Sequence, residues 1–446
     1  MNENPNESLG EELEQTRAEL AATRARIAAM EMSFFWKLRN AWWAVKGLFT
    51  RTESVASSQR VPREIVWSFP ADVAPPDQDP TGGRFAGKRV LILLPVAERG
   101  GGANVVLREA ASMRGMGVDA RIVNLRAFER SFRAAYRNPG VPVAYAAPAE
   151  IPALARGFDA VVATANRSVE WLTSLAGAPG GPVQGYYVQD FEPYFYDEGS
   201  PGHAHALASY TLLPDLVRFA KTDWNAREVE AHCGVACSVV GPSFDPTIFR
   251  ARDGERTPPP PVRITAMIRP SSPRRQPEFT LRVFERIQER FGGSVEFTLF
   301  GVDPADPAFC RMSKAFPYRQ LGIVSDERLA QLFNEAHVFA DFSSYQAMGL
   351  TAMEAMACGA AVIVPRAGGA TSFAVDGRNA LVVDTSRLDA CVESLARLVE
   401  DPARAARLGE AARREIGEFR PERAAARILE CLFPGAPLRE ASGPES

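Results

Sequence analysis

Residues 339–369 contain the side chains and glycines best suited to bind a charged ligand. Gly349 precedes a run rich in Ala and Met, 350–358, which predicts a helix that ends at Gly359. Backbone N–H groups in the first turn of a helix have no partner within it and attract anions. The stretch therefore predicts a phosphate-binding site, formed by the amides of Gly349, Leu350 and Thr351.

Glu354 is the only charged residue within this predicted helix. One interpretation is that its carboxylate accepts hydrogen bonds from sugar hydroxyls. The other is a capping box, since Thr351 and Glu354 have the required spacing. Both interpretations are consistent with the spacing, because short motifs of this kind recur by chance.

The surrounding elements predict an α/β architecture. An apolar strand at Val338–Phe342 precedes the helix, and another at Ala361–Pro365 leads into the glycine pair Gly368-Gly369. The 446 residues suffice for two domains with sizeable cores, and the 46% hydrophobic content and net charge of −3 are typical of a soluble globular protein. This charge balance disfavours nucleic acid as a partner.

We expect no metal site and no disulfide framework. The six cysteines form no CxxC pair, and His203 and His205 have no ligand cluster nearby. Asp77-Gln-Asp79 lies in a proline-rich segment and is interpreted as a coincidence. The N-terminus lacks an apolar signal core and no apolar run is long enough to span a bilayer, so the expected location is the cytoplasm.

Residues 1–51 are predicted to be helical and to precede the main fold. A seam that steps by four and three, as in a self-associating coiled coil or a lone surface helix, consists of Leu9, Leu13, Thr16, Leu20, Thr23, Ile27 and Met30, and the two threonines weaken it. Residues 34–49 combine an aromatic, apolar stripe with flanking cations, which suits peripheral binding to the inner face of the cell membrane. Packing on the main domains or on a partner chain is the alternative. Residues 52–87 are predicted to be a linker.

A first Rossmann-like domain is predicted over residues 88–257. A strand at Arg89–Pro95 leads through a glycine loop, Glu98–Asn104, into a helix at Val105–Met116. The loop lacks the GxGxxG spacing of a dinucleotide site. A later strand ends at Val188, and polar side chains follow at its carboxyl end, where open α/β sheets bind ligands. These residues are Gln189, Asp190 and Glu192.

A second Rossmann-like domain is predicted over residues 262–420, after a stiff hinge at Pro258–Pro261. Its first strand, Arg263–Ile268, ends in a loop with three arginines, namely Arg269, Arg274 and Arg275. Guanidinium groups suit phosphate oxygens, and a solvated basic turn is the alternative. A helix at 421–433 and a tail at 434–446 complete the chain.

The segment from Gln346 to Gly359 resembles the nucleotide-sugar signature of glycosyltransferase family 4. The residues that match are Gly349, Leu350, Glu354, Ala355, Met356, Ala357 and Gly359. Gln346 stands where the family signature has its first glutamate. The resemblance covers roughly residues 88–433 and implies the GT-B fold, an α/β arrangement of two Rossmann-like domains that face a cleft, with retention of configuration at the transferred sugar.

The resemblance implies how a donor would be bound by the second domain. Arg269, together with Arg275 or Arg274, would hold the donor diphosphate. Backbone near Val324 would contact the base, and Glu354 would bind the nucleoside sugar.

The resemblance also implies contacts for the transferred sugar and the acceptor. Gln346 would contact the transferred sugar, and Asp190 would orient the acceptor or the donor sugar. The glycine loop, with Gly101 and Gly102, would face the donor phosphates and the acceptor. The helix at 421–433 would cross back onto the first domain.

The segment Val188–Phe195 resembles a narrower branch, the rhamnan-forming rhamnosyltransferases that use dTDP-L-rhamnose. The implied function is transfer of L-rhamnose, without a metal or other cofactor, to a growing surface polysaccharide or lipid-linked glycan. GDP-mannose or a UDP-sugar is an alternative donor. The alternative from another class is a non-catalytic glycosyltransferase-like scaffold, because Gln189 and Gln346 replace residues that are usually histidine or acidic.

Overall fold

The computed structural model describes residues 65–69, 79–177, 179–252 and 259–436. The coiled-coil and membrane-binding segments predicted within residues 1–51 lie outside these ranges. Among the residues that the structure describes, no helix is both long enough and apolar enough to cross a membrane.

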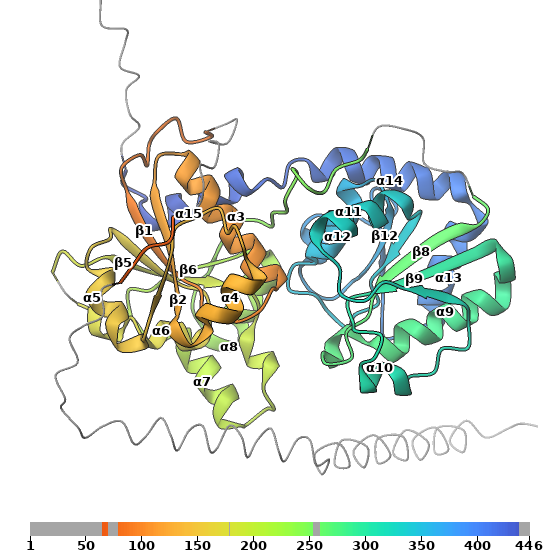
Figure 1. Ribbon diagram of the computed structural model, residues 1–446, viewed down its shortest axis with the longest axis horizontal. Helices are drawn as coiled ribbons and strands as arrows, with labels where there is room; N and C mark the ends of the chain where they lie inside the picture. Colours follow the sequence, from red (N-terminus) through yellow and green to blue (C-terminus); the bar gives the residue numbers. More distant parts are fainter. Residues whose placement is uncertain (1–64, 70–78, 178, 253–258, 437–446) are drawn as a thin grey trace, which may run out of the picture. The chain divides into compact units, whose positions relative to one another are not determined.

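Seven parallel strands form the sheet of the first domain, in the order β3-β2-β1-β4-β5-β6-β7 (Figure 1). The strands are β1 Arg89–Leu93, β2 Asp119–Leu125, β3 Val143–Ala146, β4 Ala160–Ala163, β5 Val183–Val188, β6 Val217–Ala220 and β7 Ser238–Val239. The α-helices are α3 Gly101–Gly115, α4 Glu129–Ala135, α5 Ile151–Ala155, α6 Asn166–Glu170, α7 Pro201–Ser209 and α8 Asp223–Cys233. The strand order reverses between β1 and β4, which is where such sheets bind ligands.

Six parallel strands form the sheet of the second domain, in the order β10-β9-β8-β11-β12-β13. The strands are β8 Val262–Met267, β9 Val295–Phe300, β10 Tyr318–Gln320, β11 Val338–Ala340, β12 Ala361–Pro365 and β13 Leu381–Val383. The α-helices are α9 Pro277–Phe291, α10 Pro307–Arg311, α11 Asp326–Glu335, α12 Leu350–Ala357, α13 Leu388–Glu400, α14 Pro402–Ile416 and α15 Pro421–Leu432. Here the order reverses between β8 and β11.

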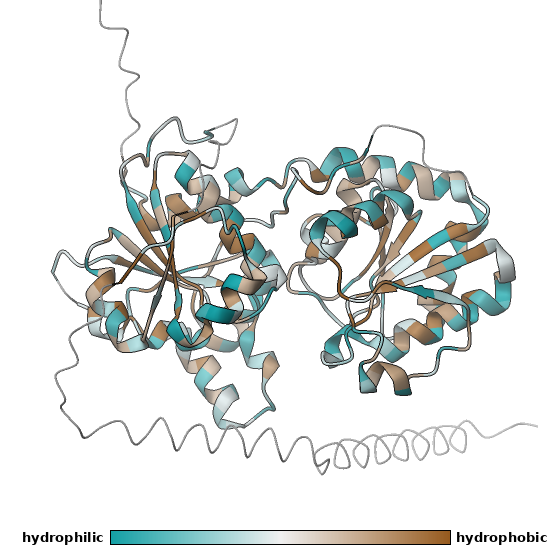
Figure 2. Ribbon diagram, in the orientation of Figure 1, coloured by the Kyte–Doolittle hydropathy of each residue, from teal (hydrophilic) through white to brown (hydrophobic). Residues whose placement is uncertain are grey.

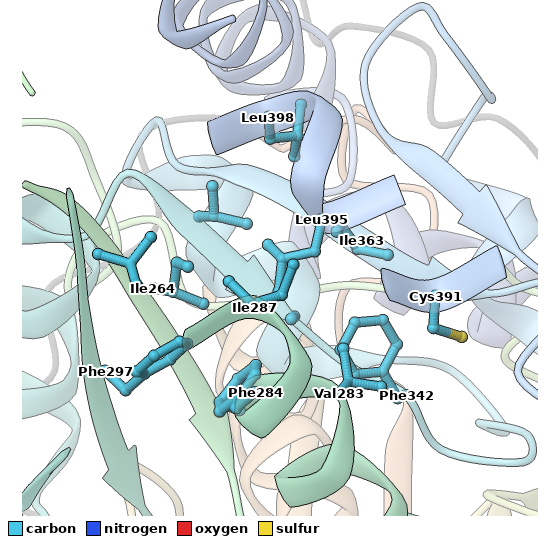
Figure 3. Close-up of a cluster of buried hydrophobic side chains, with 14 of the residues drawn as sticks. Ile264, Val283, Phe284, Ile287, Phe297, Phe342, Ile363, Cys391, Leu395 and Leu398 are labelled. Atoms are coloured by element: carbon cyan, nitrogen blue, oxygen red, sulfur yellow. The ribbon is translucent and has the colours of Figure 1, made fainter. Parts of the chain in front are cut away.

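The strands of the second domain are apolar on both faces because helices cover both faces of the sheet. Along β12, Ala361 and Ile363 belong to one buried cluster, whereas Val362 and Val364 belong to another on the opposite face. Figure 2 shows hydrophobic strands inside helices whose outer faces are hydrophilic. Figure 3 shows one of the clusters, in which β8, β9 and β12 meet α9 and α13. Its side chains include Ile264, Val283, Phe284, Ile287, Phe297, Ile363, Leu395 and Leu398.

Helix α15 returns to the first domain. It packs beside α3, β5 and β6, far from it in the sequence (Figure 1). Leu432 and Phe433 belong to the core of the first domain. A side chain at Gly185, in β5, would approach Leu432 Cδ2 to 3.1 Å, so the glycine lets the helix pack closely. The second domain is thus anchored to the first by its last helix.

The glycine loop after β1 is shorter than predicted. Helix α3 begins at Gly101 rather than at Val105, so Gly101 and Gly102 lie in its first turn. Glycine disfavours helix, but space is limited here. A Cβ atom on Gly101 would lie 3.3 Å from Leu350 Cδ2, and one on Gly102 would lie 3.4 Å from Gln189 Oε1. The close packing of these glycines against Leu350 and Gln189 therefore outweighs the low helix propensity of glycine.

Candidate functional site

A pocket of about 370 Å³ is lined by residues of both Rossmann-like domains. Two ion pairs line this pocket. Arg99 contacts Asp326 with 2.6 Å between nitrogen and oxygen, and Arg108 contacts Asp245 at 2.5 Å. Because these charges neutralise each other in pairs, Glu354 is the remaining carboxylate of the pocket lining without a cation paired to it.

Glu354 is 7% exposed, and its carboxylate forms no hydrogen bond or ion pair with any residue that the structure describes. Burial raises the pKa of Glu354 well above its usual range, and the negative charges of Asp326 and Asp245 raise it further, against the influence of Arg99. A buried carboxyl group without partners is costly. Hydroxyl donors from a ligand in the pocket would remove that cost.

The capping-box interpretation of Glu354 is wrong. Helix α12 begins at Leu350, and its N-cap is Gly349, which makes no side-chain cap. Thr351 already lies inside the helix, so it cannot form a capping box with Glu354. Gly349 has φ 93°, and a Cβ atom there would lie 3.2 Å from the ring of Phe373, so both its backbone and its surroundings require glycine.

The amides of Gly349, Leu350 and Thr351 remain unpaired among the described residues. Met353 N–H, two residues on, donates to the carbonyl of Gly349 and begins the regular helix. Leu350 also lies in the pocket lining, close to Gly101 at the start of α3. The two helix N-termini therefore approach one another beside the pocket, and both favour an anion there.

The three predicted phosphate-binding arginines lie in the loop between β8 and α9 but have different surroundings. Arg269 is exposed and has no ion pair within the described ranges. Arg275 is largely buried, and its Nη1 lies 3.7 Å from Asp341 Oδ2. Burial lowers the pKa of Arg275, Asp341 opposes this, and the charges of Arg274 and Arg269 lower it further. The three guanidinium groups repel one another, and an anion bound by this loop would relieve that repulsion.

Arg274 is engaged by Asp190 of the first domain, with 2.5 Å between Nη1 and Oδ2. Its guanidinium group also lies over the rings of Phe195 and Tyr345, 5.3 and 5.2 Å from their centroids. Burial disfavours the charge of Arg274, but Asp190 outweighs burial and raises its pKa. Of the two arginines considered for the second diphosphate contact, Arg275 is the one with the longer and weaker ion pair.

Gln346 is held by a residue that sequence reasoning missed. Its Nε2 donates to Asp341 Oδ2 at 2.9 Å and to Ser343 Oγ at 2.8 Å. Asp341 follows directly after β11, which ends at Ala340 instead of the predicted Phe342. The sequence did contain a signal for Asp341, namely a carboxylate inside an otherwise apolar predicted strand.

The remaining predicted contacts lie near the pocket. Val324 is half-buried against the second-domain core, two residues before Asp326 of the pocket lining. Its neighbour Ile323 is 80% exposed. The structure thus brings the segment predicted to touch a base beside the pocket that contains Glu354.

A second buried polar cluster escaped sequence reasoning because its members are far apart in the chain. Glu109, in α3, accepts hydrogen bonds from Lys221 and from Ser243, the latter at 2.7 Å. Tyr187 donates to the other oxygen of Glu109 at 2.6 Å. The cluster joins α3 to the ends of β5 and β6, and Ser243 also lines the pocket.

Within the described ranges, no group of three or more His, Cys, Asp or Glu residues is arranged to hold a metal ion. Asp79 instead accepts hydrogen bonds from Thr81 and Gly83 and closes a turn. His205 lies 3.3 Å from Glu170, and the backbone N–H of His203 donates to Ser200. These residues therefore have local structural partners.

Two parallel-sheet Rossmann-like domains with a pocket lined by both define the GT-B fold, and the predicted fold class is confirmed. The structure of Anabaena Alr3699/HepE in complex with UDP and glucose is similar to this chain, with a TM-score of 0.63 and 15% sequence identity. The match covers 78% of this chain and 100% of that protein. At this identity the likeness establishes the fold.

Residues 259–415 match the family described as "Glycosyl transferases group 1". Two curated relatives align over shorter stretches. The O-antigen biosynthesis protein RfbC of Myxococcus xanthus is 29% identical over 189 residues, which cover 42% of this chain and 14% of the relative. D-inositol 3-phosphate glycosyltransferase of Arthrobacter sp. (strain FB24) is 36% identical over 107 residues, which cover 24% of this chain and 25% of the relative. The chain thus spans a quarter or less of each relative.

Glu192 lies two residues after Asp190, but its carboxyl group forms its hydrogen bonds within the first domain. Its Oε1 accepts hydrogen bonds from the backbone N–H of Asn166 at 2.9 Å and from the Tyr186 hydroxyl at 2.9 Å. Burial raises the pKa of Glu192 to about 7, although both hydrogen bonds oppose this rise. The folded protein therefore retains a proton that the unfolded chain releases near 4.5, the ordinary pKa of a glutamate side chain.

The free energy of unfolding should consequently fall as the pH rises from about 4.5 through 7. The stability that Glu192 contributes is fully present below the unfolded pKa and is lost above the folded one, an effect of about 3 kcal/mol at about 1.4 kcal/mol per pH unit. Glu192→Gln should flatten this dependence, because glutamine also accepts both hydrogen bonds. Urea unfolding between pH 5 and 8 measures it, with exposed Glu296→Gln as the control. An unchanged slope in Glu192→Gln would contradict the assignment.

Proposed function

We propose that this protein is a retaining glycosyltransferase that moves a sugar from a nucleotide-sugar donor, dTDP-L-rhamnose, to a growing surface polysaccharide or lipid-linked glycan. The observation that carries the proposal is the unpartnered carboxyl group of Glu354 in a pocket of about 370 Å³. Hydroxyl groups of a nucleoside sugar would satisfy it. The arginine loop between β8 and α9 and the free amides of α12 would bind the diphosphate of the same donor.

The proposed reaction exchanges one bond at the anomeric carbon for another. The bond from this carbon to the diphosphate oxygen breaks, and the acceptor hydroxyl oxygen bonds to the carbon on the same face. The acceptor proton passes to an oxygen of the departing diphosphate. Arg269 and Arg275, with the amides of Gly349–Thr351, stabilise the charge that develops on that diphosphate.

Other residues would hold the two substrates in position. Gln346 would contact the transferred sugar, and Asp190 would orient the acceptor or the donor sugar from beside Arg274. Gly101 and Gly102 would let the donor phosphates approach the start of α3 closely. Val324 would offer backbone groups to the base.

The choice of donor rests on the resemblance of Val188–Phe195 to rhamnan-forming rhamnosyltransferases. The surface-polysaccharide acceptor is supported by the partial similarity to a protein named for O-antigen biosynthesis. GDP-mannose and UDP-sugars are the alternative donors, and a non-catalytic scaffold is the alternative class.

A panel of nucleotides and nucleotide sugars tests the proposal through thermal stability. A ligand that binds only the folded state raises the melting temperature by mass action. We expect stabilisation by dTDP and dTDP-L-rhamnose above GDP- and UDP-linked compounds, and turnover of the stabilising donor. Turnover should survive EDTA, because arginines and helix N-termini take the role of a metal. Absence of stabilisation by any nucleotide would refute the proposal, and a loss in EDTA that magnesium or manganese restores would refute its metal-free form.

Glu354→Gln tests the nucleoside contact. If the carboxylate accepts a hydrogen bond from a nucleoside hydroxyl, loss of its charge should weaken donor binding by about 1.5–3 kcal/mol, with a deoxyribose donor nearer the low end. Calorimetric titration with the donor measures the change. Glu192→Gln is the matched control, since it alters a buried carboxyl group outside the pocket lining. Equal donor affinity in Glu354→Gln and wild type would return this residue to a structural role.

Arg269→Ala tests the stabilisation of the leaving diphosphate. Its charge matters most as the diphosphate departs, so kcat should fall by roughly 10²–10³ while the melting temperature stays near that of wild type. Arg286→Ala, which removes an exposed arginine of α9, should leave kcat unchanged. An Arg269→Ala protein that is folded and fully active would remove Arg269 from the reaction.

We also propose that residues 34–49 bind anionic membrane surfaces and bring the site near a lipid-linked acceptor. The apolar aromatic stripe and its flanking cations support this. Deletion of residues 1–51 should abolish co-sedimentation with phosphatidylserine-containing vesicles and leave donor affinity unchanged. Equal sedimentation of the shortened and the full chain would reject membrane binding by this segment.

A further inference from the structure

The side chain of Gln346 can take only one orientation. Asp341 and Ser343 lie on the same side of it, and Gln346 Nε2 is 2.9 Å from the carboxylate of Asp341. A carboxylate only accepts hydrogen bonds, so the NH₂ group of Gln346 must face Asp341. Ser343 closes the arrangement, because it accepts from Gln346 Nε2 at 2.8 Å and its own hydroxyl and backbone N–H donate to Asp341 Oδ1.

Both N–H bonds of the amide are used in this way, which leaves the carbonyl oxygen of Gln346. Gln346 Oε1 has no hydrogen-bond partner among the residues that the structure describes. The residue can therefore only accept a hydrogen bond from a ligand, although a free glutamine side chain both donates and accepts.

The backbone at this position is fixed as well. The carbonyl of Gln346 accepts from Gly369 N–H at 2.6 Å, and a bridge pairs Gln346 with Gly368. A Cβ atom on Gly368 would lie 2.2 Å from that carbonyl oxygen, so only glycine allows the approach. With the backbone held, the direction of Oε1 depends on the contact between Asp341 and the amide.

Asp341 interacts more weakly with the cation Arg275 than with Gln346 and Ser343. Arg275 Nη1 lies 3.7 Å from Asp341 Oδ2, beyond hydrogen-bond distance, whereas Gln346 and Ser343 make direct hydrogen bonds to the carboxylate. Neutralising the charge of Arg275 is therefore a secondary role of Asp341. A glutamate at position 346 would instead bring two carboxylates into contact, which is strongly unfavourable in a buried setting.

We propose that Asp341 is a positioning residue that turns the Gln346 amide so that Oε1 alone faces the transferred sugar and accepts a hydrogen bond from one of its hydroxyls. This inference rests on the proposed function. It assigns specificity to a neutral acceptor: a sugar with a hydroxyl donor at this point is bound, and the corresponding deoxy sugar loses the contact.

Four proteins test the proposal: wild type, Asp341→Asn, Gln346→Glu and the double variant. Gln346→Glu alone should lower kcat/KM for the nucleotide sugar by roughly tenfold or more, because the two carboxylates repel. Asp341→Asn should lower it less, since the amide then takes both orientations. The double variant restores a donor opposite an acceptor, so it should recover to within about threefold of wild type.

Binding of the free nucleoside diphosphate separates this effect from a damaged fold. The nucleoside diphosphate lacks the sugar, and the double variant has the same net charge beside Arg275 as wild type. These two proteins should therefore bind the diphosphate with equal affinity, measured by the same thermal shift that identifies it for wild type. If wild type binds no nucleotide, the proposed function fails and this inference with it. If wild type and the double variant bind the diphosphate equally, but Gln346→Glu uses the sugar donor as well as wild type or the double variant recovers nothing, the inference alone is overturned. Reduced diphosphate affinity in the double variant would also overturn it, since the pair would then act beyond the sugar.

Discussion

Parallel strands all end at the same edge of a sheet, and nearly every polar residue of the candidate site depends on this constraint. Gln189 and Asp190 follow β5, Arg269 follows β8, and Asp341 follows β11. In the second sheet the order reverses between β8 and β11, so the arginine loop and the loop that contains Gln346 emerge side by side. One edge thereby gathers the groups that a charged ligand needs.

The charges gathered there are only partly balanced by the protein itself. Asp190 engages Arg274 at 2.5 Å, whereas Arg275 has a longer contact and Arg269 has none among the described residues. Glu354 is the opposite case, an acid without a cation paired to it. A ligand that is anionic at one end and rich in hydroxyl groups at the other would satisfy both ends, which is the chemistry of a nucleotide sugar.

A neutral side chain can stand in for a charged acceptor if its orientation is fixed. Gln346 differs by one atom from the glutamate of the family signature, and the sequence alone left open whether the site was still functional. The contact with Asp341 removes the ambiguity of the amide, since the NH₂ group is turned away and the oxygen is left free. The substitution therefore preserves an acceptor at this position while it removes a charge.

The sequence by itself determined the α/β class, the two Rossmann-like domains and the stretch around Glu354, because apolar periodicity and glycine positions act locally along the chain. Only the tertiary structure decided the strand order, which charges are paired with one another, and the position of Thr351 inside α12. Asp190 and Arg274 are 84 residues apart, and Glu109 and Lys221 are 112 apart, so no local pattern could pair them. The start of α12 at Leu350, after the left-handed backbone of Gly349, excludes the capping interpretation of Glu354, and the short motif by itself could not locate that start.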